Sequence, residues 1–108
     1  MSAPFVTSLR SRKSTIHLAE AGANAITIRV EMPEVWDVVA IVVSPGERVV
    51  TVKVRALEAL FPEAEHHEDF VVKLRGWELL NEAESLADAG VIDGSILLVT
   101  HRRRRPVR

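Results

Sequence analysis

The chain reads LADAGVIDGSILLV over residues 86–99, where a connection with two glycines leads into an aliphatic segment. Gly90 and Gly94 belong to a connection over residues 81–94, where glycine permits tight backbone turns. The aliphatic residues after Gly94 predict the last strand of the domain. The stretch therefore indicates a fold that closes with a turn-rich connection followed by one strand.

Upstream of this stretch, the hydrophobic pattern predicts further strands. Polar residues at every second position predict a half-buried strand over residues 26–32, which Pro33 ends. Residues 36–43 are apolar and rich in β-branched side chains, so they predict a second strand in a hairpin with the first. Residues 70–74 predict a third strand, and residues 77–80 are compatible with a short fourth one.

Residues 47–61 fit two patterns. Apolar residues at alternate positions suit a strand, whereas Val49, Val52, Ala56 and Leu60 fall at helical spacing. The second half of the segment is rich in strong helix formers and is followed by a proline, which together favour a helix. We therefore predict a helix here.

The predicted order is ββαββ, an α+β fold in which one helix packs on one face of a mixed sheet. The helix buries its apolar side by lying across the sheet, so the other sheet face stays uncovered. We divide the chain into a flexible N-terminal arm (residues 1–24), in which no hydrophobic period is sustained, a single domain (residues 25–101) and a basic C-terminal tail (residues 102–108).

Composition limits the class of protein. A chain of 108 residues, of which 47% are hydrophobic and 27% charged, has room for one globular domain. Cysteine is absent from the sequence, which excludes disulfides and thiolate metal sites. The apolar runs are shorter than a membrane span and no secretory signal is recognisable, so we expect a cytoplasmic protein without a membrane span. The net charge of −1 combines an acidic body with basic ends.

The sequence of residues 86–99 resembles the closing segment of ubiquitin-like β-grasp domains. In those domains a Leu-x-Asp turn precedes an aliphatic anchor and a final strand. Pro45, before the predicted helix, and Gly76, after the third strand, also fall where such a domain has its own proline and glycine. The resemblance covers residues 25–102 and implies a ubiquitin-like β-grasp fold, in which Leu86 and Val91 plug the open end of the core.

Within that superfamily, the run from Leu86 to Gly94 is most similar to the bacterial YukD and EsaB proteins and to the N-terminal ubiquitin-like domains of EccD, which are associated with type VII secretion. The resemblance implies a non-enzymatic module that works by docking. Ubiquitin-like modifiers and sulfur carriers instead use a C-terminal di-glycine, and no glycine follows Gly94 in this sequence. A modifier or sulfur carrier is therefore the alternative that the sequence disfavours.

The uncovered sheet face is the predicted binding surface. Alternation along the strands turns one set of residues away from the helix, and most of this set is apolar, although such a face normally carries polar residues. In the families that the chain resembles, docking most often uses this face. The alternatives are that β-branched residues merely favour strands, or that the N-terminal arm covers the patch. The predicted protein-binding residues are Val42, Val71, Lys73, Ile96, Leu98 and Thr100.

The basic tail is a second candidate for contact with a partner. Its arginines suit phosphate or anionic lipid, but no aromatic residue is interleaved with them for base stacking, which disfavours nucleic acid. The simplest interpretation is a solvated tail that improves solubility or contacts the acidic body of its own chain, and an acidic protein partner is the best functional alternative. The predicted electrostatic residues are Arg102, Arg103, Arg104 and Arg105.

No residue pattern predicts catalysis, a metal or a cofactor. His66 and His67 stand in an acidic loop, but neighbours in an extended segment point opposite ways, and no spaced histidine or cysteine pair completes a metal site. Neither a nucleophile paired with a base nor a glycine-rich phosphate loop is recognisable. Trp36 and Trp77 stand at turns, where we expect each to cap the rim of its own core rather than to anchor a partner.

Overall fold

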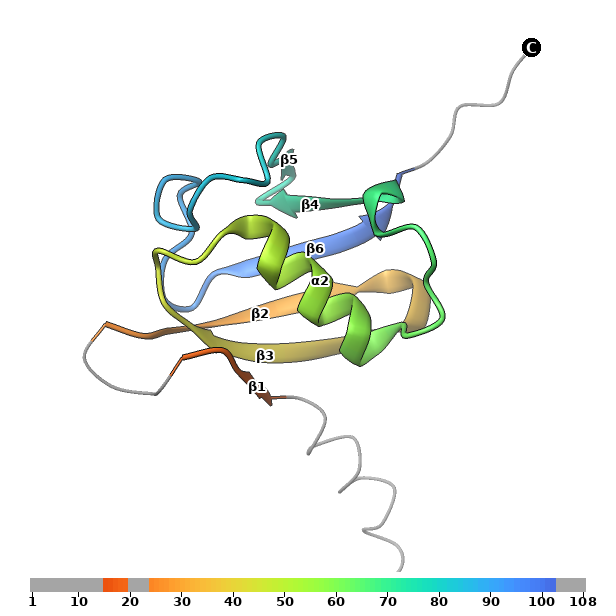
Figure 1. The fold of residues 1–108 in the computed structure, drawn as a ribbon, viewed down its shortest axis with the longest axis horizontal. Coiled ribbons are helices and arrows are strands. Elements are labelled where there is room, and N and C mark those ends of the chain that lie inside the picture. The colour runs from red at the N-terminus through yellow and green to blue at the C-terminus, as the bar shows by residue number, and fades with distance from the viewer. Residues whose placement is uncertain (1–14, 20–23, 103–108) are drawn as a thin grey trace, which may run out of the picture.

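The strands form one mixed sheet, and an α-helix lies across it (Figure 1). The computed structural model describes residues 15–19 and 24–102. Across the sheet the strand order is β1-β3-β2-β6-β4-β5. The elements are β1 (Thr15–His17), β2 (Ile26–Met32), β3 (Asp37–Val43), α2 (Val49–Leu60), β4 (Phe70–Leu74), β5 (Trp77–Glu78) and β6 (Ile96–His101), with 3-10 turns at Pro33–Val35 and His67–Asp69.

The hairpin of β2 and β3 forms one half of the sheet. The two strands pair antiparallel along their full length, from Ile26 opposite Val43 to Met32 opposite Asp37. Strand β6 joins this hairpin to the other half, because it runs parallel to β2 and antiparallel to β4. Within the described residues, the predicted mixed sheet with a single helix is confirmed. Trp77–Glu78 form the short strand β5 within residues 77–80.

The helical interpretation of residues 47–61 is confirmed, since Val49–Leu60 form α2. The apolar side of α2 packs against the sheet and joins the core. No side chain caps the start of the helix; instead the amide of Val50 donates to the carbonyl oxygen of Glu82, at 2.8 Å. In the described part of the chain no helix has the length and hydropathy needed to cross a membrane.

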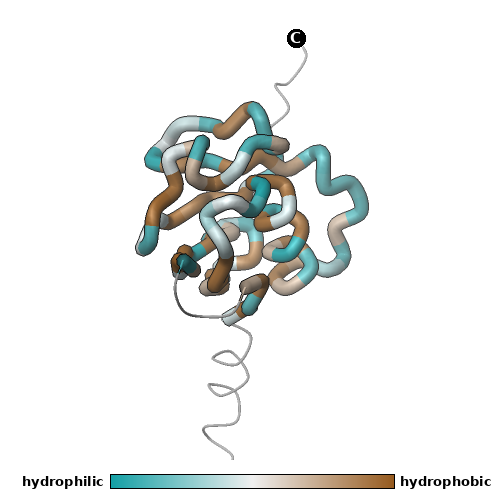
Figure 2. Tube along the Cα trace, turned by 60° about the vertical axis from the view of Figure 1, so that its left-hand side comes forward, coloured by the Kyte–Doolittle hydropathy of each residue, from teal (hydrophilic) through white to brown (hydrophobic). Residues whose placement is uncertain are grey.

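The core lies between α2 and one face of the sheet. As predicted, Leu86 and Val91 close one end of it: both are buried, and the Val91 amide donates to the Leu86 carbonyl at 2.9 Å. Gly90 and Gly94 have φ angles of 94° and 87°, which glycine adopts without steric penalty. Hydrophobic residues lie mainly along the helix and strands, whereas the connection between α2 and β4 is mostly hydrophilic (Figure 2).

The structure differs from the predicted arm at residues 15–17, which form the edge strand β1, parallel to β3. Ile16 and Leu18 are half-buried and pack against the core. Three residues are too few to show a period in the sequence, and the strand forms because β3 offers an edge and the core offers an apolar surface. The rest of the predicted arm, residues 1–14 and 20–23, lies outside the described residues.

Candidate protein-binding face

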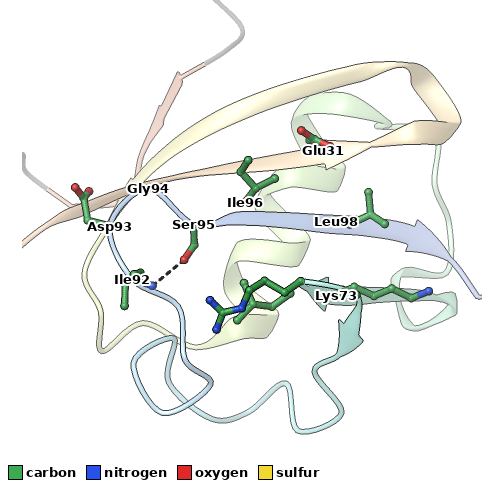
Figure 3. Close-up of a pocket in the computed structure, with 11 residues that line it drawn as sticks. Glu31, Lys73, Ile92, Asp93, Gly94, Ser95, Ile96 and Leu98 are labelled. Carbon is green, nitrogen blue, oxygen red and sulfur yellow. Dashed lines mark hydrogen bonds between the residues drawn. The ribbon is translucent and has the colours of Figure 1, made fainter.

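The six predicted binding residues alternate with core residues along β3, β4 and β6, so they lie on the sheet side opposite α2. Figure 3 views this side, with α2 behind the sheet. They are not equally accessible. Ile96 is 49% exposed, whereas Val42 and Val71 are buried at 9% and 4% exposed. Lys73, Leu98 and Thr100 are half-buried.

The strand register brings a central row of side chains together on this side. Leu98 on β6 lies opposite Glu31 of β2 and opposite Lys73 of β4. Figure 3 shows Glu31 and Lys73 on either side of the strand that carries Ile96 and Leu98. The result is an apolar strip on β6 between an acidic and a basic side chain. We call Glu31, Lys73, Ile96 and Leu98 the open face.

A hollow of about 530 Å³ extends the open face toward the turn before β6. Ile92, which is 64% exposed, lines it together with Ile96. Two side-chain hydrogen bonds help to hold this turn in place: the Ile92 amide donates to Ser95 Oγ at 2.9 Å, and the Thr27 amide donates to Asp93 Oδ1 at 2.8 Å. Ile92 is therefore presented by a fixed turn rather than by a loose loop.

Two residues contribute to this surface although the sequence pattern does not predict them there. Glu31 is exposed at its centre, although the predicted face contains no residue of β2. The sequence does contain a signal for the position of Glu31, because the polar residues of 26–32 must face the same side as Leu98 once β2 and β6 pair. Ile92 has no such signal, since its exposure depends on how the preceding connection folds.

Val71 is covered near the point where the tail leaves the sheet. It lines a hollow of about 280 Å³ together with Glu78 and Arg102. The Arg102 guanidinium lies 3.5 Å from a Glu78 carboxylate oxygen, and its backbone amide donates to the Asp69 carbonyl at 2.7 Å. Arg102 is thus paired with a neighbour at the edge of the sheet. The other predicted tail residues, Arg103, Arg104 and Arg105, lie outside the described residues.

Glu34 ties the β2–β3 turn to the end of β6. One of its carboxylate oxygens, Oε2, accepts hydrogen bonds from the Thr100 hydroxyl and from the His101 amide, both at 2.7 Å. Partial burial raises the pKa of Glu34, but these two hydrogen bonds, its own amide and the positive charge of His101 outweigh burial and leave the pKa below its ordinary 4.5. The hydroxyl of Thr100, a predicted binding residue, is therefore engaged within the fold.

The expectation that both tryptophans cap the core is wrong. The side chains of Trp36 and Trp77 are 90% and 77% exposed. Trp36 also adopts a positive φ of 53° at the end of the turn between β2 and β3. For a bulky side chain this is a strained backbone conformation.

The described residues of the acidic loop around His66 and His67 form no metal site. His66 Nδ1 lies 3.4 Å from a Glu68 carboxylate oxygen, and both side chains are exposed. Within residues 15–19 and 24–102, no three histidine, aspartate or glutamate side chains are grouped so that they can hold a metal ion.

No family model and no curated protein sequence matches this chain. Several solved structures, in contrast, are similar to this chain in fold. The ubiquitin-like domain of an Arabidopsis thaliana protein superposes with a TM-score of 0.61 at 18% identity, covering 86% of this chain and 94% of that one. The C-terminal ubiquitin-like domain of mouse tubulin-specific chaperone e gives 0.63 at 17%, covering 82% and 100%. Ubiquitin of Caldiarchaeum subterraneum gives 0.61 at 17%, covering 77% and 100%.

These likenesses show the fold. The protein has the ubiquitin-like β-grasp fold, an α+β architecture with one helix on one face of a mixed sheet, so the predicted fold class is confirmed. The identities are too low to carry the neighbours' properties to this chain. What this chain can do must be argued from its own surface.

Proposed function

We propose that this protein is a non-enzymatic protein-interaction module that docks through its open face. The observation that carries the proposal is the β6 strip of Ile96 and Leu98 placed between Glu31 and Lys73. A solvated sheet face normally presents polar residues, whereas this strip leaves Ile96 half exposed and continues into Ile92. Burying these side chains against another surface removes apolar area from water, which favours association.

The charges of Glu31 and Lys73 indicate which chemical groups a partner surface should carry. A protein surface that fits would place an aliphatic side chain on the β6 strip, a basic group near Glu31 and an acidic group near Lys73. Neither Glu31 nor Lys73 forms an ion pair within the described residues. Their charges are therefore available to set the orientation of the partner, while the aliphatic contact supplies most of the affinity.

The basic tail would contribute electrostatic steering toward an acidic region of the same partner. Arg102 lines the hollow that also contains Lys73 and Leu98, so the chain leaves the sheet beside the open face. Steering of this kind acts on the association rate and weakens as salt rises. We include Arg103, Arg104 and Arg105 in this role on the basis of their sequence alone.

We further propose that the module works in the bacterial cytoplasm as an accessory component of a type VII-like secretion system. The support for this setting is the resemblance of residues 86–94 to the YukD, EsaB and EccD sequences. Deleting the gene in its host and measuring export of small helical substrates tests it. Unchanged export would remove the secretion role without affecting the docking proposal.

Affinity capture from the host with matched variants tests the docking proposal. Leu98→Asp places a charge in the β6 strip, and Leu80→Asp makes the same chemical change at a leucine that is 81% exposed and lines a separate hollow beside α2. Quantitative mass spectrometry should find partners whose recovery falls at least about tenfold with Leu98→Asp and is unchanged with Leu80→Asp. Equal recovery with both variants would refute docking through the open face.

Charge reversal then tests the predicted partner chemistry. With one recovered partner purified, isothermal titration should show weaker binding for Glu31→Lys and for Lys73→Glu. The alternative function, a ubiquitin-like modifier or sulfur carrier, predicts covalent adducts of the protein in its host. Mass spectrometry of the intact protein distinguishes the two, since docking leaves the chain unmodified at its C-terminus.

A further inference from the structure

The outer edge of β3 is only partly paired. Along its inner edge β3 pairs with β2 through every residue from Asp37 to Val43. Along its outer edge the described residues pair it with β1 only at Ala40, Ile41 and Val42. An unpaired strand edge is a template for an added strand, so the way in which β1 occupies this edge reveals what the edge accepts.

β1 shows a simple recognition pattern. Ile16 lies opposite the buried Ile41, and both Ile16 and Leu18 pack against the core. Thr15 and His17, which alternate with them, are exposed. The amides of Leu18 and Ala19 both donate to the Val42 carbonyl, at 2.8 and 3.2 Å. The edge therefore takes an extended segment, parallel to β3, with aliphatic side chains at alternate positions and backbone groups that continue the ladder.

β1 pairs with β3 over a shorter length than β2 does on the other edge of β3. It contributes three residues, and its one apolar side chain, Ile16, is half-buried like Leu18 just after it, whereas core residues such as Ile41 and Val43 are fully buried. Elements with few buried contacts open at a lower free energy than the rest of a domain. The advantage of β1 is that it belongs to the same chain, which gives it a high effective concentration beside β3.

We propose that the outer edge of β3 is a second binding site, which takes an extended peptide of another protein and which β1 occupies as an intramolecular competitor. The incoming segment pairs parallel to β3, carries aliphatic residues at positions equivalent to Ile16 and Leu18, and has no proline between them because the ladder needs its amides. This site is separate from the open face, since it uses the backbone of β3 and the core surface beside Ile41.

A fluorescein-labelled synthetic peptide of residues 12–19 is the probe, and full-length protein is the receptor. Fluorescence polarisation measures its binding to wild type and to Ile16→Asp, in which β1 can no longer pack on the core. If β1 is closed in about nine molecules of ten, its release tightens the apparent Kd about tenfold. Thr15→Asp is the matched control, because it makes an acidic change on the exposed side of the same strand and should bind the probe as wild type does.

Several outcomes decide the proposal. It holds if Ile16→Asp and a second variant, Leu18→Asp, both bind the probe more tightly than wild type, while a probe with aspartate at the Ile16 position binds none of them. Equal affinity for wild type and both variants, with circular dichroism unchanged, overturns it. Concentration-dependent dimerisation of the variants without probe binding also overturns it and assigns the edge to a second copy of the chain. Leu98→Asp should not alter probe binding, which separates this site from the open face.

Discussion

Replacing Lys53 by methionine tests how the helix is held to the rest of the domain. Lys53 lies on α2 and is the one buried charged side chain among the described residues, at 3% exposed. Its Nζ donates to the Phe70 carbonyl at 2.9 Å and lies 2.8 Å from Glu82 Oε1. The ammonium group thus links the helix to the start of β4 and to the connection after β5. Methionine keeps the apolar stem and removes only this link.

The magnitude follows from the two contacts. Leaving the buried Phe70 carbonyl without a donor costs about 1–3 kcal/mol. Removing one partner of a fully buried ion pair costs about 3–5 kcal/mol, but the Glu82 side chain is 23% exposed and retains water, so this contribution is smaller. We expect Lys53→Met to lower the free energy of unfolding by about 3 kcal/mol. With an m-value of about 1.5 kcal/mol/M, the urea midpoint falls by about 2 M.

Urea titration followed by circular dichroism is the assay, because both tryptophans are largely exposed in the native state and their fluorescence changes little on unfolding. Arg55→Met is the control: it breaks the exposed Arg55–Glu58 pair on the same helix and should cost less than about 0.5 kcal/mol. Glu82→Gln keeps an acceptor for Lys53, so it should cost about 1 kcal/mol, and its effect should largely vanish in the Lys53→Met background. A Lys53→Met midpoint within about 0.3 M of wild type would refute the reasoning.

Two further predictions concern the turn between β2 and β3. Trp36→Gly should raise the free energy of unfolding by about 1 kcal/mol in the same assay, because glycine relieves the positive φ and the exposed indole contributes little packing; a loss of stability contradicts this. Glu34→Gln should destabilise the protein at pH 6. Because the folded pKa of Glu34 lies below 4.5, the advantage of wild type over this variant should shrink as pH falls from 4.5 through the folded pKa. A difference that grows on acidification is the contrary result.

Local patterns were sufficient for most of the elements. The alternation in residues 26–32 and 70–74 predicts strands that the structure confirms at Ile26–Met32 and Phe70–Leu74. The helix over Val49–Leu60 was ambiguous because its valines suit a strand as well. What resolves it is the connection at Glu82 and Glu84, whose carbonyls accept the first helical amides. That contact joins residues about thirty positions apart, so no window of sequence contains it.

The candidate binding face also contains residues that the sequence places correctly and residues that only tertiary pairing places. The sequence places Ile96, Leu98 and Lys73 on the side away from the helix, because strand side chains alternate. It does not show that Glu31 lies beside Leu98, which depends on the parallel pairing of β2 with β6. Nor does it show that Val71 is covered, since that depends on the residues that share its hollow at the sheet edge.

The amino-acid order alone determined the strands at Ile26–Met32 and Phe70–Leu74 and the existence of a partly apolar sheet face, because these follow from the spacing of apolar residues within one element. Tertiary pairing decided the rest: which strands are neighbours, which charges flank the β6 strip, and that Ile16 and Leu18 complete the edge of β3. These features depend on contacts between segments that are distant in the sequence. Such contacts form through backbone pairing and burial of apolar side chains, which occur only when the whole chain folds.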